Sequence, residues 1–242
     1  MTDPATLRQR FLAEPLTLRN ERRDFPEWHR GRPHYVLWAL DVDTPAVRAR
    51  VAAAQRALDG LLLGDYRRQP HVTLALCGFP AQGRLPAEDE FDAHRIAAQV
   101  AALQAGGPGA FDLAIGGLES FSSAPFLTVH DPGEALTTLR RCLQAEGAHP
   151  HGSYVPHVTV GLYAGAWPSA EAVGRFGQLP AVPQLRHRIT RLSLLGYAAA
   201  EIGGAGGENL PTAGAAPPRP AGPPPARPRR FGGPRPPAAA PT

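Results

Sequence analysis

The tetrapeptide Pro-His-Val-Thr occurs twice in this sequence, with its histidine at His71 and at His157. Both copies lie in apolar runs rich in β-branched residues, which favours β-strands. Because side chains alternate between the two faces of a strand, His71 shares a face with Thr73, and His157 shares one with Thr159. The shorter pattern of histidine followed two residues later by threonine or serine is expected by chance about once in a chain with nine histidines. The repetition is what indicates a function.

Two imidazoles and two hydroxyls that face one cleft suit general acid–base catalysis. Histidine has an ordinary pKa of about 6.5, so near neutral pH one ring can accept a proton while the other donates one. Threonine hydroxyls can donate hydrogen bonds to the non-bridging oxygens of a phosphoryl group held between the rings. This arrangement suits in-line displacement at phosphorus, and it requires no metal or other cofactor. The alternative is that valine and threonine serve only as strand formers and each histidine merely fills a position.

Residues 203–242 differ in composition from the rest of the chain. Half of them are proline or glycine, which predicts a disordered tail. The tail holds five arginines and one glutamate, so it accounts for the whole formal charge of +4, and residues 1–202 are neutral. A basic nucleic-acid-binding body is therefore not predicted. The tail arginines predict at most weak, salt-sensitive contact with RNA, or docking of a protein partner on the prolines.

Several classes of function are excluded or disfavoured by composition. All 25 basic residues are arginine, so catalysis by a lysine amine is excluded. The two cysteines, Cys77 and Cys142, make neither a disulfide framework nor a metal motif. The sequence shows no signal peptide and no apolar run long enough to span a bilayer. We therefore expect a cytoplasmic monomer without membrane contact.

Hydrophobic patterning predicts an α+β fold in which the order strand–helix–strand–helix occurs twice. The expected strands are residues 34–42, 71–79, 110–118, 125–131, 155–163 and 189–199. One helix is expected to begin at Pro45 with Thr44 as its N-cap, and the others are expected at residues 87–105, 134–147 and 169–179. Each Pro-His-Val-Thr copy lies on the second strand of its repeat. We therefore predict two similar halves within one domain, each of which supplies one motif.

Four segments resemble the two-histidine phosphoesterases, and in particular the bacterial 2′-5′ RNA ligase / RNA 2′,3′-cyclic phosphodiesterase family. These segments are YVLWALDVDTPAVRARVAAAQRAL, HVTLALCGF, FDLAIGGLESF and YVPHVTVGLY. The resemblance runs from about residue 34 to 199. It implies a domain at residues 34–202 after an N-terminal extension at 1–33. The implied fold has two pseudo-symmetric lobes whose antiparallel sheets flank a central cleft, with helices outside.

The resemblance also implies the roles of the motif residues. His71 and His157 would be the catalytic pair, and Thr73 and Thr159 would bind phosphate. His157 would activate water as the base, which leaves His71 as the acid. Family members often carry an arginine shortly after the second motif, whereas this chain continues with Gly161, Leu162 and Tyr163.

Other side chains near the motifs are candidates for substrate binding. Arg67 and Arg68 precede the first motif and could contact a phosphate backbone. Tyr154 and Phe121 could stack on a base or pack in the core. His149 and His151 are expected in a solvated loop rather than in a metal site, because no set of three or four ligands surrounds them in the sequence.

The most specific hypothesis is hydrolysis of RNA or nucleotide 2′,3′-cyclic phosphate ends to 2′-phosphates. The same groups would catalyse reversible 2′-5′ RNA ligation. One alternative is the same chemistry on a small cyclic nucleotide. The other is a non-catalytic module that binds RNA ends, although binding alone would not require two titrating imidazoles.

Overall fold

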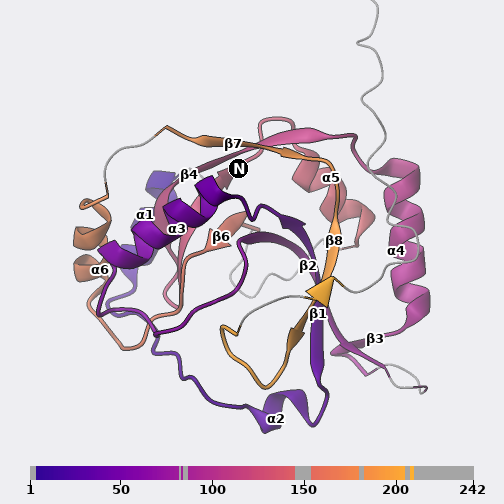
Figure 1. Ribbon diagram of the computed structural model, residues 1–242, viewed down its shortest axis with the longest axis horizontal. Helices are drawn as coiled ribbons and strands as arrows, with labels where there is room; N and C mark the ends of the chain where they lie inside the picture. The colour runs from indigo at the N-terminus through magenta and orange to yellow at the C-terminus, as the bar shows by residue number, and fades with distance from the viewer. Residues whose placement is uncertain are drawn as a thin grey trace, which may run out of the picture.

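The computed structural model describes residues 4–81, 83, 87–144, 154–179, 183–204 and 208–209 (Figure 1). The helices are α1 (Pro4–Ala13), α2 (Pro26–His29), α3 (Pro45–Ala57), α4 (Ala93–Gly106), α5 (Ala135–Cys142) and α6 (Ser169–Phe176). The strands are β1 (His34–Asp41), β2 (His71–Pro80), β3 (Glu90–Phe91), β4 (Phe111–Ser120), β5 (Pro125–His130), β6 (His157–Thr159), β7 (Leu185–Ile189), β8 (Ser193–Ala198) and β9 (Glu208–Asn209). The predicted α+β class is confirmed.

The strands form two sheets, and each sheet contains one of the two motifs. Sheet 1 has the order β3-β2-β1-β8-β9 and sheet 2 the order β6-β5-β4-β7. All pairings are antiparallel except the one between β2 and β3. The predicted two-lobed arrangement of antiparallel sheets is therefore present.

The two halves of the sequence are interleaved rather than separate. The predicted strand at 189–199 is two strands: β7 pairs with β4 in sheet 2, and β8 pairs with β1 in sheet 1. Ile189 is buried in one lobe and Leu194 in the other, whereas Thr190 and Arg191 between them are exposed. The prediction of one strand was wrong because apolar residues on both sides of a crossing look like one continuous run.

Helices from both halves cover the outer face of each sheet (Figure 1). On sheet 1, α4 supplies Gln99, whose side chain accepts a hydrogen bond of 2.8 Å from the Trp38 indole and donates one of 2.9 Å to the Leu143 carbonyl. On sheet 2, the helix α3 supplies Arg50, which donates to the Ile115 carbonyl at 3.1 Å. The lobes are thus connected by α3, which follows β1 of sheet 1 and contacts β4 of sheet 2, as well as by the crossing from β7 to β8.

The apolar faces of the two motif strands form the core. Val72, Leu74, Val158 and Val160 have no exposed surface, and all belong to one continuous hydrophobic cluster. Strand alternation therefore places the histidine and threonine side chains on the opposite faces, which line the space between the sheets. Burial of the valine and leucine side chains fixes the register, because a one-residue slip would turn them towards the cleft.

Two predicted boundaries need correction on this side of the molecule. The predicted helix at 87–105 begins only at Ala93, where the Asp92 side chain accepts the Arg95 N–H at 2.9 Å. Residues 90–91 form β3 instead, because the buried Glu90 carboxylate pairs with Arg32 at 3.2 Å. The start of α3 at Pro45 was predicted correctly: the Thr44 side chain is the N-cap and accepts the Val47 N–H.

The second motif strand is shorter than the predicted residues 155–163. After Thr159, the Val160 N–H donates to the Pro125 carbonyl at 2.9 Å. The Leu162 carbonyl then accepts the Leu63 N–H at 2.8 Å, so the chain turns away to pair with the segment after α3. Gly161 permits this close approach, since a Cβ there would lie 3.0 Å from Leu62.

Both predicted terminal segments are described in part. Residues 4–33 contact both lobes: the Asn20 amide donates to the Ser123 carbonyl at 2.9 Å, and Arg32 pairs with Asp89 at 2.8 Å. At the other end, β9 adds a strand to sheet 1 beyond residue 203, where the disordered tail was predicted to begin. Residues 210–242 of that tail lie outside the described residues.

Gly78 in β2 provides a test of the fold. It has a φ of +99°, and a Cβ there would lie 2.3 Å from the Asp89 carbonyl oxygen, which also accepts the Phe79 N–H. We expect Gly78→Ala to lower the free energy of unfolding by about 1–3 kcal/mol, because the strained φ and the clash disrupt the β2–β3 pairing. Urea unfolding measures this loss. Gly133→Ala is the control, since a Cβ there meets nothing within 4 Å; an equal loss in both variants would contradict the explanation.

Candidate active site

The two motif histidines are held by the same hydrogen bond. His71 is the first residue of β2, and its Nδ1 donates to the Gln69 carbonyl at 2.8 Å. His157 is the first residue of β6, and its Nδ1 donates to the Val155 carbonyl, also at 2.8 Å. A carbonyl oxygen can only accept, so Nδ1 carries the proton in the neutral tautomer of each ring. Each Nε2 is then the nitrogen that can exchange a proton with a ligand.

The two motifs lie side by side although they belong to different sheets. Strands β2 and β6 contact each other in the middle of the molecule (Figure 1). The Tyr154 hydroxyl, just before β6, donates to the Thr73 carbonyl of β2 at 2.8 Å. The Tyr66 phenol, in the segment before β2, lies close enough to the Thr159 side chain of β6 for that hydroxyl to lower its pKa. The structure thus brings together the four residues singled out from the sequence.

His71 is almost fully buried, with 8% of its surface exposed. The Tyr197 hydroxyl lies 3.3 Å from its ring nitrogens. Burial lowers the pKa of His71, and the nearby charge of Arg68 lowers it further, while the Gln69 carbonyl and Asp41 oppose the shift. The ring is therefore neutral at pH 7, and its Nε2 begins as a proton acceptor.

Arg68 lies beside His71 with part of its donor capacity unused. Its guanidinium carbon lies 4.4 Å from the centre of the Tyr197 ring. Its Nε atom is buried and has no hydrogen-bond partner among the described residues. A buried N–H without a partner costs free energy, so an anion that accepts this hydrogen bond would be stabilised here.

His157 lies in an aromatic setting. The Phe121 ring meets its imidazole edge-on with the centroids 5.0 Å apart, and Phe126 lies 5.2 Å away. Phe121 and Phe126 also pack on each other at 4.3 Å. Phe121, predicted as a stacking or packing residue, therefore packs on the catalytic candidate itself.

Two of the candidates for substrate binding, Tyr154 and Arg67, have different surroundings in the structure. The Arg140 guanidinium covers one face of the Tyr154 ring at 3.9 Å, so that face is closed to a stacked base. Burial raises the pKa of the Tyr154 phenol, as expected for a packed rather than a rim side chain. Arg67 has an exposed side chain, and its backbone N–H donates to the Gly203 carbonyl at 2.9 Å. Arg68 thus lies at His71, and its neighbour faces solvent.

Sequence reasoning missed Tyr66 and Tyr197. Tyr66 reaches Thr159 across the lobes, and burial raises the pKa of its phenol. Tyr197 belongs to β8 and reaches His71 from a position 126 residues further along the chain. The only sequence signal was the closeness of Tyr66 to the first motif, and no local pattern connects Tyr197 with His71.

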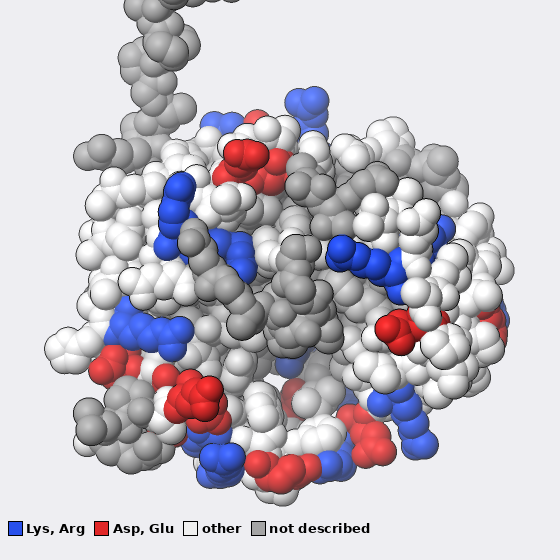
Figure 2. Space-filling model, turned by 180° about the vertical axis from the view of Figure 1, so that it is seen from behind, with Lys and Arg blue, Asp and Glu red and all other residues white. Residues whose placement is uncertain are grey.

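Charged side chains of both signs are mixed over the surface seen in Figure 2, as the neutral charge of residues 1–202 leads one to expect. Among the described residues, no group of three or more His, Cys, Asp or Glu side chains is placed to hold a metal ion. His149 and His151 lie outside the described residues. Every described helix is too short or too polar to cross a membrane.

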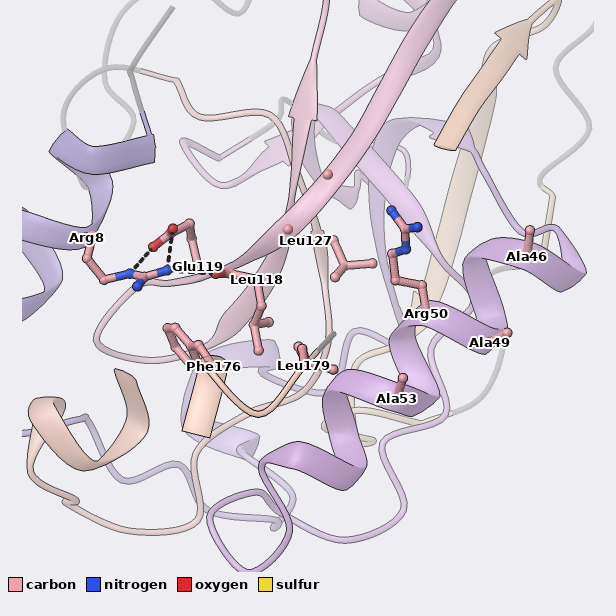
Figure 3. A pocket seen from close by; sticks show the side chains of 13 residues that line it. Arg8, Ala46, Ala49, Arg50, Ala53, Leu118, Glu119, Leu127, Phe176 and Leu179 are labelled. Atoms are coloured by element: carbon pink, nitrogen blue, oxygen red, sulfur yellow. Dashed lines mark hydrogen bonds and ion pairs between the residues drawn. The ribbon is translucent and has the colours of Figure 1, made fainter. Parts of the chain in front are cut away.

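A separate hollow of about 620 Å³ lies between α3, α6 and sheet 2 (Figure 3). The ion pair between Arg8 and Glu119 stands at one end, with contacts of 2.8 and 2.6 Å. Leu118 and Leu127 line it, and Leu127 is paired with Val158, whose side chain points away from the His157 face. The hollow is therefore on the opposite side of sheet 2 from the histidines.

Comparison with known proteins supports the arrangement described above. The family model of the 2′-5′ RNA ligase superfamily matches residues 41–201. The chain belongs to this superfamily. The match begins at Asp41, the last residue of β1, and ends just after β8, so it contains both motifs and strands β2 to β8.

Solved structures of similar proteins have low sequence identity with this chain. Escherichia coli LigT complexed with 3′-AMP is 16% identical, with 68% of this chain and 88% of that chain covered and a TM-score of 0.44. TT0787 of Thermus thermophilus is 19% identical, with 66% and 87% covered and a TM-score of 0.41. ATU0111 from Agrobacterium tumefaciens is 14% identical, with 70% and 82% covered and a TM-score of 0.42. No curated protein matches the chain.

Proposed function

We propose that this member of the 2′-5′ RNA ligase superfamily is a metal-independent phosphodiesterase that opens 2′,3′-cyclic phosphates at RNA or nucleotide ends. The observation that carries this proposal is the matched setting of His71 and His157. Each ring is fixed through Nδ1 by a carbonyl at 2.8 Å, on neighbouring strands of different sheets. Two imidazoles held alike, each with Nε2 left for proton transfer, suit a reaction that needs one base and one acid.

In the proposed reaction a water oxygen attacks phosphorus as the bond from phosphorus to the ribose 3′ oxygen breaks. One imidazole takes a proton from the water, and the other gives a proton to the departing 3′ oxygen. The product is a 2′-phosphate with a free 3′ hydroxyl. A 5′ hydroxyl can take the place of water: it attacks the same cyclic phosphate, the bond from phosphorus to the 3′ oxygen breaks, and a 2′-5′ linkage forms by the same proton transfers.

Thr73, Thr159 and Arg68 would hold the non-bridging oxygens of the phosphate. Both threonines are half-buried and share the faces of their histidines. The Thr159 hydroxyl lies beside the Tyr66 phenol, and the Arg68 Nε is the buried donor without a partner among the described residues. These donors are in place before substrate binds, which is the condition under which they stabilise developing charge most effectively.

The roles of the two histidines depend on how the phosphate shifts their pKa values. The resemblance assigns the acid role to His71, which requires a protonated ring. Burial and Arg68 lower the pKa of His71 in the free protein. A phosphodiester anion between the rings would raise that pKa, since a nearby negative charge favours imidazolium. We therefore propose that His71 becomes protonated on substrate binding, and His157 activates the water.

Turnover of a short oligonucleotide with a 2′,3′-cyclic phosphate end, in the presence of EDTA, tests the proposal. We expect the wild-type protein to form a 2′-phosphate, detected by mass spectrometry, with a bell-shaped dependence of kcat/KM on pH. A 3′-phosphate product would refute the assignment of the leaving oxygen. No product between pH 5 and 9, from the oligonucleotide or from a mononucleotide cyclic phosphate, would refute the enzymatic function and favour a non-catalytic module.

A further inference from the structure

The register of sheet 2 places a row of polar side chains on the same face as His157. Thr128 of β5 is paired with His157, and His130, two residues further along, is paired with Ala114 of β4. Ala114 is in turn paired with Arg186 of β7. Paired residues of neighbouring strands point to the same face. His157, Thr128, His130 and Arg186 therefore share one face of sheet 2.

Arg188 and Asp112 continue this face at its far edge. They are paired in the register of β7 and β4, and their side chains form an ion pair of 3.1 Å. Both are more than half exposed, as is typical of a surface pair of little net stability. The opposite face of the same strands is apolar and buried. Its residues include Leu113, Ile115, Val129 and Ile189.

Gly116 lies in the middle of this polar face, at a position where a larger residue would collide with a neighbouring side chain. A Cβ on Gly116 would lie 2.5 Å from the Thr128 hydroxyl oxygen and 3.7 Å from the Gln184 amide nitrogen. Glycine therefore leaves room over β4 for the side chains of Thr128 of β5 and of Gln184, the residue before β7. The result is a face on which Thr128 and His130 of β5 lie between His157 and the arginines of β7, with the small residues Ala114 and Gly116 of β4 in between.

The corresponding face of sheet 1 is more apolar, although Asp41, paired with His71, and Ser193, paired with Ala39, also lie on it. Thr73 is paired with Ala39, and Leu37 on the same face is paired with Leu195. Leu37, Ala39, Leu195 and Tyr197 form a buried cluster of their own. A chain of phosphates that extends from the histidines would lose hydration over sheet 1, whereas sheet 2 offers hydroxyl, amide and guanidinium groups.

The position of the arginines decides what kind of substrate could reach them. Arg186 is three strands from His157, which is about 14 Å at the usual strand spacing. Among the described residues it forms no ion pair, and Arg188 is held only by an exposed carboxylate. A mononucleotide cyclic phosphate has one phosphate, and that phosphate is needed at the histidines. Arg186 and Arg188 can therefore meet only a phosphate further along a strand.

We propose that the cleft face of β5, β4 and β7 binds the nucleotides that precede the cyclic end of a single-stranded RNA, with Arg186 and Arg188 on their phosphates. This inference rests on the proposed function and narrows its substrate to an oligonucleotide. The contacts are to the backbone, so they favour length rather than sequence. Each phosphate contact adds to the salt dependence of binding.

The test compares a mononucleotide 2′,3′-cyclic phosphate with a ten-nucleotide RNA that ends in the same cyclic nucleotide. We expect the wild type to prefer the ten-nucleotide RNA in kcat/KM by about tenfold or more at low salt. Arg186→Ala/Arg188→Ala should remove most of this preference and leave mononucleotide turnover within twofold. For the ten-nucleotide RNA, the slope of log(kcat/KM) against log[salt] is negative. Its magnitude should be smaller by about 1.4 in the double variant, since each of the two lost phosphate contacts to a single strand contributes about 0.7.

Arg10→Ala/Arg56→Ala is the matched control, because it removes two exposed arginines from α1 and α3 on the outer side of sheet 2. The proposal is overturned if the wild type shows no length preference, if the control behaves like the test variant, or if the test variant loses activity on both substrates equally. If neither substrate is turned over, the proposed function fails by itself. In that case, RNA binding to the proposed surface is measured by fluorescence anisotropy, with the same ten-nucleotide RNA carrying a 3′-phosphate. Weaker binding by the test variant, but not by the control, supports the proposed surface. Unchanged binding by the test variant overturns it.

Discussion

Replacement of His71 or His157 by glutamine will lower kcat for cyclic phosphate opening by about 10²–10⁴-fold, the range for loss of a positioned acid or base. Glutamine is close to histidine in size and can keep a hydrogen bond to the Gln69 or Val155 carbonyl, but it cannot exchange a proton at neutral pH. The two rings act in one step, so the double variant should be little slower than the poorer single variant. Product formation by mass spectrometry measures the effect.

The pH profile distinguishes loss of catalysis from loss of structure. Each single variant should lose one limb of the wild-type bell, because one titrating group has been removed. His94→Gln is the matched control, since His94 is exposed on α4, and it should keep both the rate and the profile. A rate within tenfold of wild type in either motif variant, with unchanged circular dichroism, would contradict the two-histidine mechanism.

Replacement of Arg68 by glutamine is expected to lower kcat/KM by about 10²–10³-fold, as for removal of one preorganised donor to a developing oxyanion. The Arg68 Nε is buried and without a partner among the described residues, and its guanidinium lies against Tyr197 at His71. Arg68→Lys should restore part of the rate, since it returns the charge without the planar donor set. Arg67→Gln, which changes the exposed neighbour, should be close to wild type.

The same substitution should change the titration of His71 in a defined direction. The Arg68 charge is one of the causes that lower the pKa of His71, so Arg68→Gln should raise that pKa, and Arg67→Gln should not. Titration of the histidine ring protons by NMR measures both. A loss of activity in Arg68→Gln without any rise in the pKa of His71 would mean that the variant acts by disturbing the structure.

The sequence was sufficient to find the motif residues and the faces they occupy. Strand alternation, together with the apolar side chains of Val72, Leu74, Val158 and Val160, determined which way the histidines point. The Thr44-Pro45 start of α3 followed from local capping chemistry. These are short-range properties, because they depend on neighbours within one strand or one helical turn.

Other features depend on segments far apart in the chain, and no local pattern could reveal them. Tyr197 reaches His71 only because β8 returns to sheet 1, and Tyr66 reaches Thr159 only because the segment before β2 crosses to the other lobe. The division of the last predicted strand into β7 and β8 likewise depends on strands far away in the sequence, β4 and β1. Its residues are apolar on both sides of the crossing, and only strand pairing shows to which sheet each belongs.

By itself, therefore, the sequence determined the class of fold, the two histidines and the chemistry that they suit. The tertiary structure alone decided which arginine lies at His71 and which faces solvent, since Arg67 and Arg68 are adjacent and chemically identical. It also decided that the polar path from the histidines runs over sheet 2. The physical reason is that burial and long-range pairing, rather than residue type, determine whether an arginine, a tyrosine or a glycine can meet a ligand.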